Sequence, residues 1–188
     1  MAIIKPLELK LSSGEIVYIR PAEESDALEI IKYLKEVLSA SKVMLSQEHE
    51  ISPTIEGNIS WIKNSSDSPN KLILLAIHNS NIIGMIDFKN GHRERNSHTG
   101  NFAMSVQKHW RGRGIGKALL TSLLNWAEVN DCIEKVCLSV FANNHIALNL
   151  YKNFGFKEEG RRPRSYKLFP GKYVDEIMMY KFVTKFNE

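Results

Sequence analysis

The chain has 188 residues, 43% of them hydrophobic and 24% charged, and its 25 Lys and Arg against 21 Asp and Glu give a net charge of +4. This length and apolar content fit one domain with one sizeable core, and they exclude a disordered chain, a collagen-like repeat and a disulfide scaffold. No internal repeat or Gly/Ser linker is visible, so we expect residues 1–188 to form a single domain.

The cysteines and the first residues bear on the cellular compartment. Cys132 and Cys137 are too few for a stapled secreted domain and have no partners for a zinc cluster, so we expect free thiols and no metal. The N-terminus has no basic region before an apolar run, and no stretch approaches the ~20 apolar residues of a membrane helix. We therefore expect a cytoplasmic protein that does not bind membranes.

The first half of the chain predicts strand, helix, helix and hairpin. Residues 15–20 alternate as a strand, and Asp26 can cap a helix that carries an apolar face as far as Leu38. A second helix is expected to begin at Ser52-Pro53, a cap followed by proline at the first helical position. Two apolar runs then flank a short, turn-prone loop, which predicts a hairpin over residues 71–88.

The second half predicts alternating strands and helices. A strand over residues 101–106 precedes a helix from Ile115 to Ala127, whose apolar residues follow the i, i+3, i+4, i+7 pattern. Another strand is predicted over residues 134–141, followed by a short helix that ends at Gly155. A closing strand pair is expected over residues 165–169 and 173–182. The order is that of a mixed α/β domain.

A glycine-rich loop lies between the strand that ends at residue 106 and the most regular helix. The loop is Arg111, Gly112, Arg113, Gly114, Ile115, Gly116 and Lys117. Glycines let a ligand approach the backbone closely, and the N–H groups at a helix start favour phosphate. A tight turn that needs glycine only for steric reasons is the alternative. The basic side chains in the loop favour the phosphate interpretation.

The spacing of this loop separates it from two better-known phosphate binders. A Walker A loop needs glycine where this chain has Arg111, and serine or threonine where it has Ala118. The dinucleotide pattern G-x-G-x-x-G, counted from Gly112, needs glycine at Lys117. Both patterns fail, and Arg-x-x-Gly-x-Gly remains.

That remaining pattern resembles the acetyl-coenzyme A loop of the GNAT N-acetyltransferase superfamily, Q/R-x-x-G-x-G/A. A second family signature, V-x-x-x-N…A-x-x-x-Y-x-x-x-G-F, is similar to residues 140–144 followed by residues 150–156. The resemblance covers roughly residues 15–183. It implies an α/β (α+β) fold with a mixed, mostly antiparallel central sheet of about six to seven strands and about four flanking helices. It also implies a splayed central strand pair, in which residues 134–141 move away.

The resemblance implies transfer of an acetyl group from acetyl-CoA, as co-substrate, to a primary amine by direct attack. The diphosphate would lie on the backbone amides of residues 111–117. The positions that match the pantetheine arm are Met104, Ser105 and Val106. Asn144 would contact the arm, and the Tyr151 hydroxyl would lie near the thioester sulfur, where it can protonate the leaving thiolate. From the residues alone, Asn144 could merely cap a helix and Tyr151 could be a core aromatic.

The chain departs from the family pattern at the general base. Many relatives carry a glutamate where this chain has Ser139, which cannot do that job alone. The candidates for a replacement are Asp87, Glu56, Glu50 and His98, and each of them also fits a solvated or structural role.

The acceptor is less well indicated. The aromatic residues that could line its pocket, or simply pack in the core, are Trp61, Tyr166, Phe169 and Tyr173. The end of the chain, residues 167–178, resembles bacterial members that act on amino acids and other small amines, and also relatives that modify protein N-termini. We expect a small primary amine. The alternatives are a ribosomal-protein type N-terminal acetyltransferase and a non-catalytic acyl-CoA-binding sensor.

The net charge also points to an anionic cofactor. The basic residues between positions 107 and 117 are Lys108, Arg111, Arg113 and Lys117, with no acid among them. Without these four residues, the numbers of basic and acidic side chains are equal. The surplus is therefore assigned to the glycine loop. We expect no nucleic-acid partner, because no recognised motif accompanies the charge. A homodimer remains open.

Overall fold

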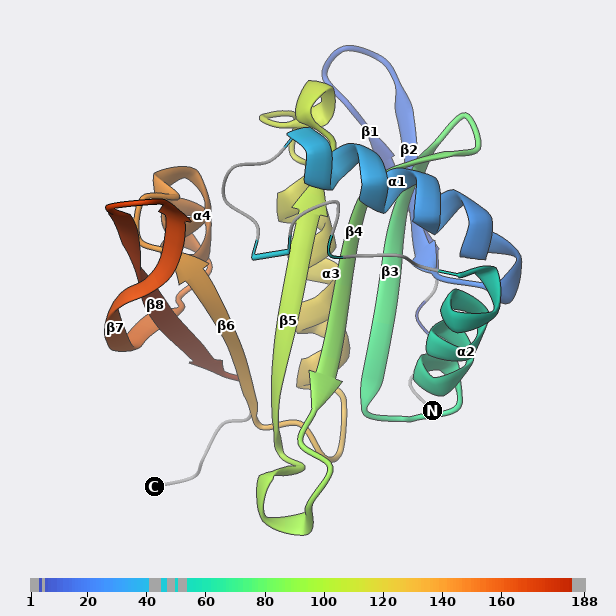
Figure 1. The fold of residues 1–188 in the computed structure, drawn as a ribbon. Helices are drawn as coiled ribbons and strands as arrows, with labels where there is room; N and C mark the ends of the chain where they lie inside the picture. The colour runs from blue at the N-terminus through green and yellow to red at the C-terminus, as the bar shows by residue number, and fades with distance from the viewer. Residues whose placement is uncertain (1–3, 5, 41–44, 47–49, 51–53, 184–188) are drawn as a thin grey trace.

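The computed structural model describes residues 4, 6–40, 45–46, 50 and 54–183 of the chain. They form one eight-stranded sheet in the order β1-β2-β3-β4-β5-β6-β8-β7 (Figure 1). Its strands are β1 (Leu7–Lys10), β2 (Ile16–Pro21), β3 (Lys71–His78), β4 (Asn81–Asn90), β5 (Thr99–Val106), β6 (Lys135–Phe141), β7 (Lys157–Phe169) and β8 (Lys172–Phe182). The helices are α1 (Ala27–Ala40), α2 (Ile55–Ser66), α3 (Ile115–Glu128) and α4 (His145–Asn153).

The sheet is antiparallel except at its centre, where β5 and β6 run parallel. These two strands pair over only three positions, from Thr99–Lys135 to Asn101–Cys137. Beyond that point β6 leans away from β5 towards β8, as Figure 1 shows. The expected splayed pair is therefore confirmed, and we call the opening between β5 and β6 beyond Asn101 the fork.

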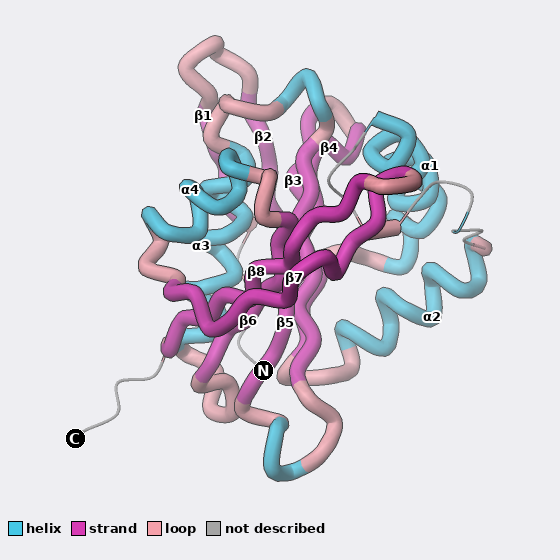
Figure 2. Tube along the Cα trace, turned by 60° about the vertical axis from the view of Figure 1, so that its left-hand side comes forward, coloured by secondary structure: helices cyan, strands magenta, loops and turns pink. Residues whose placement is uncertain are grey.

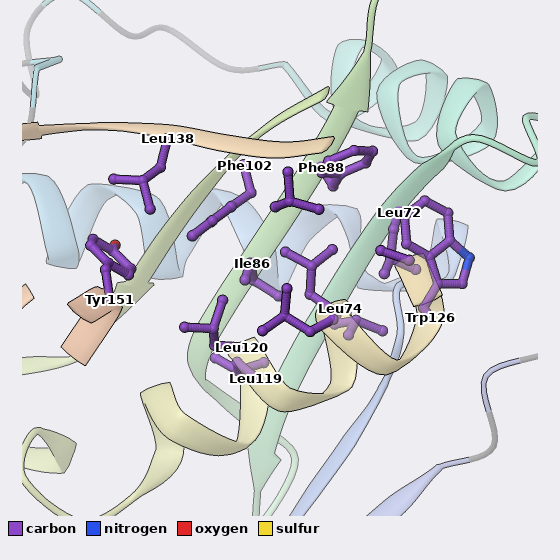
Figure 3. Close-up of a cluster of buried hydrophobic side chains, with 14 of the residues drawn as sticks. Leu72, Leu74, Ile86, Phe88, Phe102, Leu119, Leu120, Trp126, Leu138 and Tyr151 are labelled. Carbon is purple, nitrogen blue, oxygen red and sulfur yellow. The ribbon is translucent and has the colours of Figure 1, made fainter. Parts of the chain in front are cut away.

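Helices cover both faces of the sheet. In Figure 2, α3 and α4 lie on one side of the strands, and α1 and α2 lie on the other side. The larger hydrophobic core joins α3 and α4 to the sheet, and the smaller one lies under α1 and α2. Figure 3 shows the larger core, in which Leu119 and Leu120 of α3 lie against Leu74 and Ile86 of the sheet. The apolar periodicity predicted for α3 thus marks its buried face.

Three details differ from the sequence expectations. The sheet has eight strands where about six to seven were expected, because β1 (Leu7–Lys10) forms before the first predicted strand and pairs with β2. Strand β7 begins at Lys157 rather than at residue 165. Helix α2 begins at Ile55, and its cap is Thr54, whose side chain accepts a hydrogen bond from the Gly57 N–H. The predicted start at Ser52-Pro53 lies outside the described residues.

Other expectations can be compared directly. Gly155 has φ +82° and follows Phe154, the C-cap of α4, as expected of a residue that ends a helix. Both cysteines are free, Cys132 half-buried and Cys137 buried. In the described parts of the chain, no helix is long and apolar enough to cross a membrane.

Candidate active site

The fork leaves one backbone edge of β5 without a strand partner. The Gln107 N–H donates to the Ile83 carbonyl of β4, and backbone groups alternate in direction along a strand. The N–H and C=O groups of Met104 and Val106 therefore point away from β4 and into the fork, whereas those of Ser105 point to β4. Of the three residues predicted to line the pantetheine arm, Met104 and Val106 can pair with it through the backbone. Such an edge can take an extended ligand as an added strand.

The glycine loop forms an open backbone cradle at the end of this edge. Gly112 and Gly114 have φ +74° and +88°, and a Cβ built on either would have no atom within 4 Å. Gly114 is the N-cap of α3 and carries no side-chain cap, so the first N–H groups of the helix keep no intrahelical partner. No acidic residue lies in the first turn. Positive φ, open space and free N–H groups together fit a phosphate ligand.

The remaining residues of the loop join it to its surroundings. A Cβ on Gly116 would lie 3.6 Å from Met104 Cε, so this glycine faces β5 rather than solvent. Ile115 is buried in the larger core. The Arg111 Nε donates to the Val106 carbonyl at 2.9 Å, which fixes the guanidinium at the mouth of the fork.

Arg113 is held by the turn between β1 and β2. It forms an ion pair with Glu15 and a hydrogen bond with Ser13, and its guanidinium lies 4.7 Å from the centre of the Trp110 ring. Hydrogen bonds from Ser13 and Arg113 lower the pKa of Glu15 to about 2. One of the four positive charges between positions 107 and 117 is therefore paired within the protein, which corrects the assignment of the whole surplus to a ligand.

Tyr151 lies on the α3/α4 side of the fork. It is 7% exposed, and its ring meets Phe102 of β5 edge-on at 5.7 Å and Phe156 in a tilted contact at 6.0 Å, between ring centres. Figure 3 shows it at the end of the core beside Phe102 and Leu138, which come from the two strands of the fork. Burial raises the pKa of Tyr151 to about 12, so its hydroxyl is protonated at neutral pH.

Asn144 is the N-cap of α4 rather than a helical residue. Its Oδ1 accepts from the Ala147 N–H at 3.2 Å. The capping role that the sequence left open for Asn144 is thus present. The side-chain NH₂ is not used by this cap and keeps its donors for another partner.

The α1/α2 side of the fork is polar. The Ser105 Oγ and the Tyr33 hydroxyl of α1 are 2.8 Å apart and share a hydrogen bond. Burial raises the pKa of Tyr33 above its usual range. Ala103 and Ser139, on the facing strands, are exposed. This face therefore offers polar groups and open surface where the other face offers Tyr151 and apolar packing.

The sequence reasoning did not single out Glu176 of β8. Its carboxylate accepts hydrogen bonds from Arg162 at 3.0 Å, from Ser139 and from Tyr166. Burial alone would raise the pKa of Glu176, but these bonds together lower it. No local signal marks Glu176, because its place beside Ser139 depends on the register between β6 and β8.

The four base candidates occupy different places. Asp87 lies on β4 opposite Ala103 of β5. His98 precedes β5 by one residue, ~13 Å along the strand from the first position inside the fork. Glu56 is exposed in the first turn of α2, and Glu50 precedes that helix. Among them, only Asp87 belongs to a strand that borders β5.

The predicted acceptor aromatics do not form one group. Tyr166 stacks on Phe141 at 4.0 Å between ring centres and so lies beside the fork. Trp61 packs against the core under α1 and α2. Phe169 and Tyr173 are exposed near the turn between β7 and β8. Within the described residues, no cluster of three His, Cys, Asp or Glu side chains could hold a metal ion.

Comparisons with known proteins agree with this geometry. A sequence profile of the acetyltransferase (GNAT) family matches residues 32–156. The L-amino acid N-acetyltransferase AaaT of Escherichia coli is 31% identical over 119 residues, 63% of this chain and 73% of that protein. The N-alpha-acetyltransferase RimI of Mycobacterium tuberculosis is 38% identical over 65 residues, but these are only 35% of this chain and 39% of that protein.

The fold has a close counterpart among solved structures. A GNAT-family acetyltransferase from Streptococcus pneumoniae superposes with a TM-score of 0.86 and 28% identity, over 88% of this chain and 99% of that protein. The matched family segment includes the fork, the glycine loop and Tyr151. The chain therefore belongs to the acetyltransferase (GNAT) family and is an acetyl-CoA-dependent acyltransferase.

Proposed function

We propose that the protein transfers the acetyl group of acetyl-CoA to the primary amine of a small molecule, such as an amino acid, in a ternary complex. The observation that carries the proposal is the fork. It combines an unpaired β5 edge, an open glycine cradle at its end and a buried tyrosine beside it. The similarity to an L-amino acid N-acetyltransferase over most of that protein's length favours a small acceptor.

Each group in the fork has a task in this proposal. The amides of residues 111–117 hold the diphosphate, and the backbone of Met104 and Val106 pairs with the pantetheine arm. An N–H of the same edge can polarise the thioester carbonyl. Tyr151 donates its proton to the departing sulfur, for which it is poised because its pKa keeps it protonated. The free NH₂ of Asn144 is the donor offered to the arm.

Direct transfer needs no covalent enzyme intermediate. The nearest thiol is Cys137, the last β6 residue that pairs with β5, and burial raises its pKa. A raised pKa makes a thiol a poor nucleophile. The acceptor amine is therefore the group expected to attack.

The test is release of coenzyme A thiol with a panel of the twenty L-amino acids, spermidine and spermine, alongside calorimetric titration with acetyl-CoA. We expect saturable binding and turnover of at least one panel member. Acetylation of a peptide N-terminus without turnover of any small amine would favour the alternative suggested by the RimI similarity. Tight binding without any turnover would identify a non-catalytic sensor instead.

A further inference from the structure

Asp87 occupies the row of the sheet at which the fork has just opened. It pairs with Ala103 across β4 and β5. The last β5–β6 pair, Asn101 with Cys137, lies two residues earlier on each strand, so Ser139 stands at the level of Ala103 across the fork. Residues that face each other across neighbouring strands point to the same side of the sheet. Asp87, Ala103 and Ser139 therefore form one row on the α1/α2 face.

Only a methyl group separates Asp87 from the open edge. Ala103 is exposed, and its side chain ends at Cβ. Neighbouring strands are ~4.8 Å apart. A group bound over the β5 edge is thus within reach of the Asp87 carboxylate, directly or through one water.

The chemical state of Asp87 suits a proton acceptor. Among the described residues, no side chain hydrogen-bonds or ion-pairs with it, although it is half-buried. Burial raises the pKa of Asp87 to about 6, and Lys89 on the same strand opposes that rise. A base whose pKa lies close to the working pH is the most effective.

The elements packed around Asp87 supply little charge. The strand neighbours are Ile73 of β3 and Ala103 of β5, and neither is charged. Helix α1 turns Tyr33 towards the sheet, and its hydroxyl is bonded to Ser105. Helix α2 turns Ile62 inwards. In the described structure, the carboxylate thus has no side-chain partner that would explain its position, and its hydrogen bond is to the Asp87 backbone.

The second carboxylate at the fork is less suitable. Glu176 accepts bonds from Arg162, Ser139 and Tyr166, and its pKa is lowered. A carboxylate held in its ionised form by these donors, and by the Ser165 hydroxyl, takes up a proton poorly. Its contacts instead hold β7 to β6 and β8.

We infer that Asp87 is the general base of the reaction, an assignment that rests on the proposed acetyltransferase function. The ammonium group of the acceptor gives a proton to the Asp87 carboxylate, which leaves a neutral amine. The amine nitrogen forms the new C–N bond at the thioester carbonyl, and the C–S bond breaks. Sulfur leaves with the electron pair and takes a proton from the Tyr151 hydroxyl. The nitrogen loses its second proton as the amide forms, and this proton restores the Tyr151 hydroxyl. Asp87 then releases its proton to water.

The test compares Asp87→Asn with the wild type and with Asp131→Asn, a control at an exposed position in the loop before β6. The acceptor is the panel amine with the highest kcat/KM, and rates are measured from pH 5 to 9. We expect a ~10²- to 10⁴-fold fall in kcat at pH 7 for Asp87→Asn, with KM for acetyl-CoA within about threefold. The wild-type rate should level off above the Asp87 pKa of about 6. The variant should instead gain tenfold per pH unit up to the amine pKa, because it needs amine already neutral in solution.

Two results would overturn the assignment while leaving acetyl transfer intact. One is an Asp87→Asn enzyme with unchanged kcat and pH profile. The other is a Glu176→Gln enzyme that shows the profile expected of Asp87→Asn. If the wild type binds acetyl-CoA but turns over no panel amine, the proposed function fails first and the assignment falls with it.

A second measurement needs no acceptor. Carboxyl ¹³C resonances of aspartate-labelled protein saturated with coenzyme A should include one that titrates near pH 6 and is missing from Asp87→Asn. The variant should fold, because the amide replaces a carboxylate that makes no side-chain bond in the described structure. Titration of that resonance near pH 4 or below would contradict the assignment.

Discussion

Tyr151→Phe separates catalysis from packing at the fork. The substitution keeps the ring that contacts Phe102 and Phe156 and removes only the hydroxyl. No residue in the described chain hydrogen-bonds with that hydroxyl, so its loss leaves no polar group unpaired. We therefore expect the free energy of unfolding to change by no more than ~0.5 kcal/mol.

The effect on turnover should be much larger. Loss of a general acid typically costs ~10²- to 10⁴-fold in rate, and a 10²-fold fall corresponds to ~2.7 kcal/mol of transition-state stabilisation. Because the pKa of Tyr151 is about 12, the hydroxyl stays protonated through the neutral range. The wild-type rate should therefore show no loss from Tyr151 ionisation up to pH 10.

The assay is thiol release at saturating acetyl-CoA, together with thermal melting of both proteins. Tyr151→Ala is the matched contrast, because loss of the whole buried ring should cost ~3–5 kcal/mol of stability. A Phe variant whose kcat stays within about threefold of the wild type would refute the role of the hydroxyl. A Phe variant that melts as early as the Ala variant would refute the claim that the ring, and not the hydroxyl, stabilises the fold.

Three further substitutions test the glycine loop, the packing of the sheet and the Arg113–Glu15 ion pair. Gly114→Ala should lower the free energy of unfolding by ~1 kcal/mol, because φ is +88°. It should also weaken acetyl-CoA binding, measured by calorimetry, and unchanged affinity would show that the cradle holds no phosphate. Gly100→Ala would place Cβ 2.1 Å from the Phe88 ring, so denaturant unfolding should reveal a loss of ~1–3 kcal/mol or more. The lowered Glu15 pKa stabilises the fold above pH ~4.5, and this contribution fades as pH falls to about 2. Glu15→Gln should therefore show a shallower loss of stability in that acid range, and an unchanged slope would count against the pairing.

The sequence predicted the elements whose burial follows a local period. Helix α3 has the i, i+3, i+4 pattern because one stripe of it packs on the sheet, and its start at Ile115 was located correctly. Strand β1 was missed because it is a four-residue edge strand with mostly exposed side chains. The first part of β7 was missed for a similar reason, since exposed charged residues there hide any alternation.

The candidate site was predictable to the extent that it is local in sequence. The glycine loop is a short motif whose spacing alone excludes other phosphate loops. The positions of Asp87 and Glu176 relative to Ser139 depend on strand register, which no local sequence pattern reveals. Arg113 and Glu15 likewise meet across 98 positions of sequence, so the loop charge could not be corrected from composition.

The two faces of the fork differ in a way that suits direct transfer. On the α3/α4 face, Tyr151 keeps a proton in apolar surroundings where a thiolate would depart. On the α1/α2 face, Asp87 is open to an ammonium group that arrives from the other side of the sheet. In the proposed reaction, the proton taken from the acceptor ammonium group and the proton given to sulfur are therefore handled by different residues on opposite faces. Neither residue needs to move between the two substrates, and the sheet can stay rigid while the thioester lies in its opening.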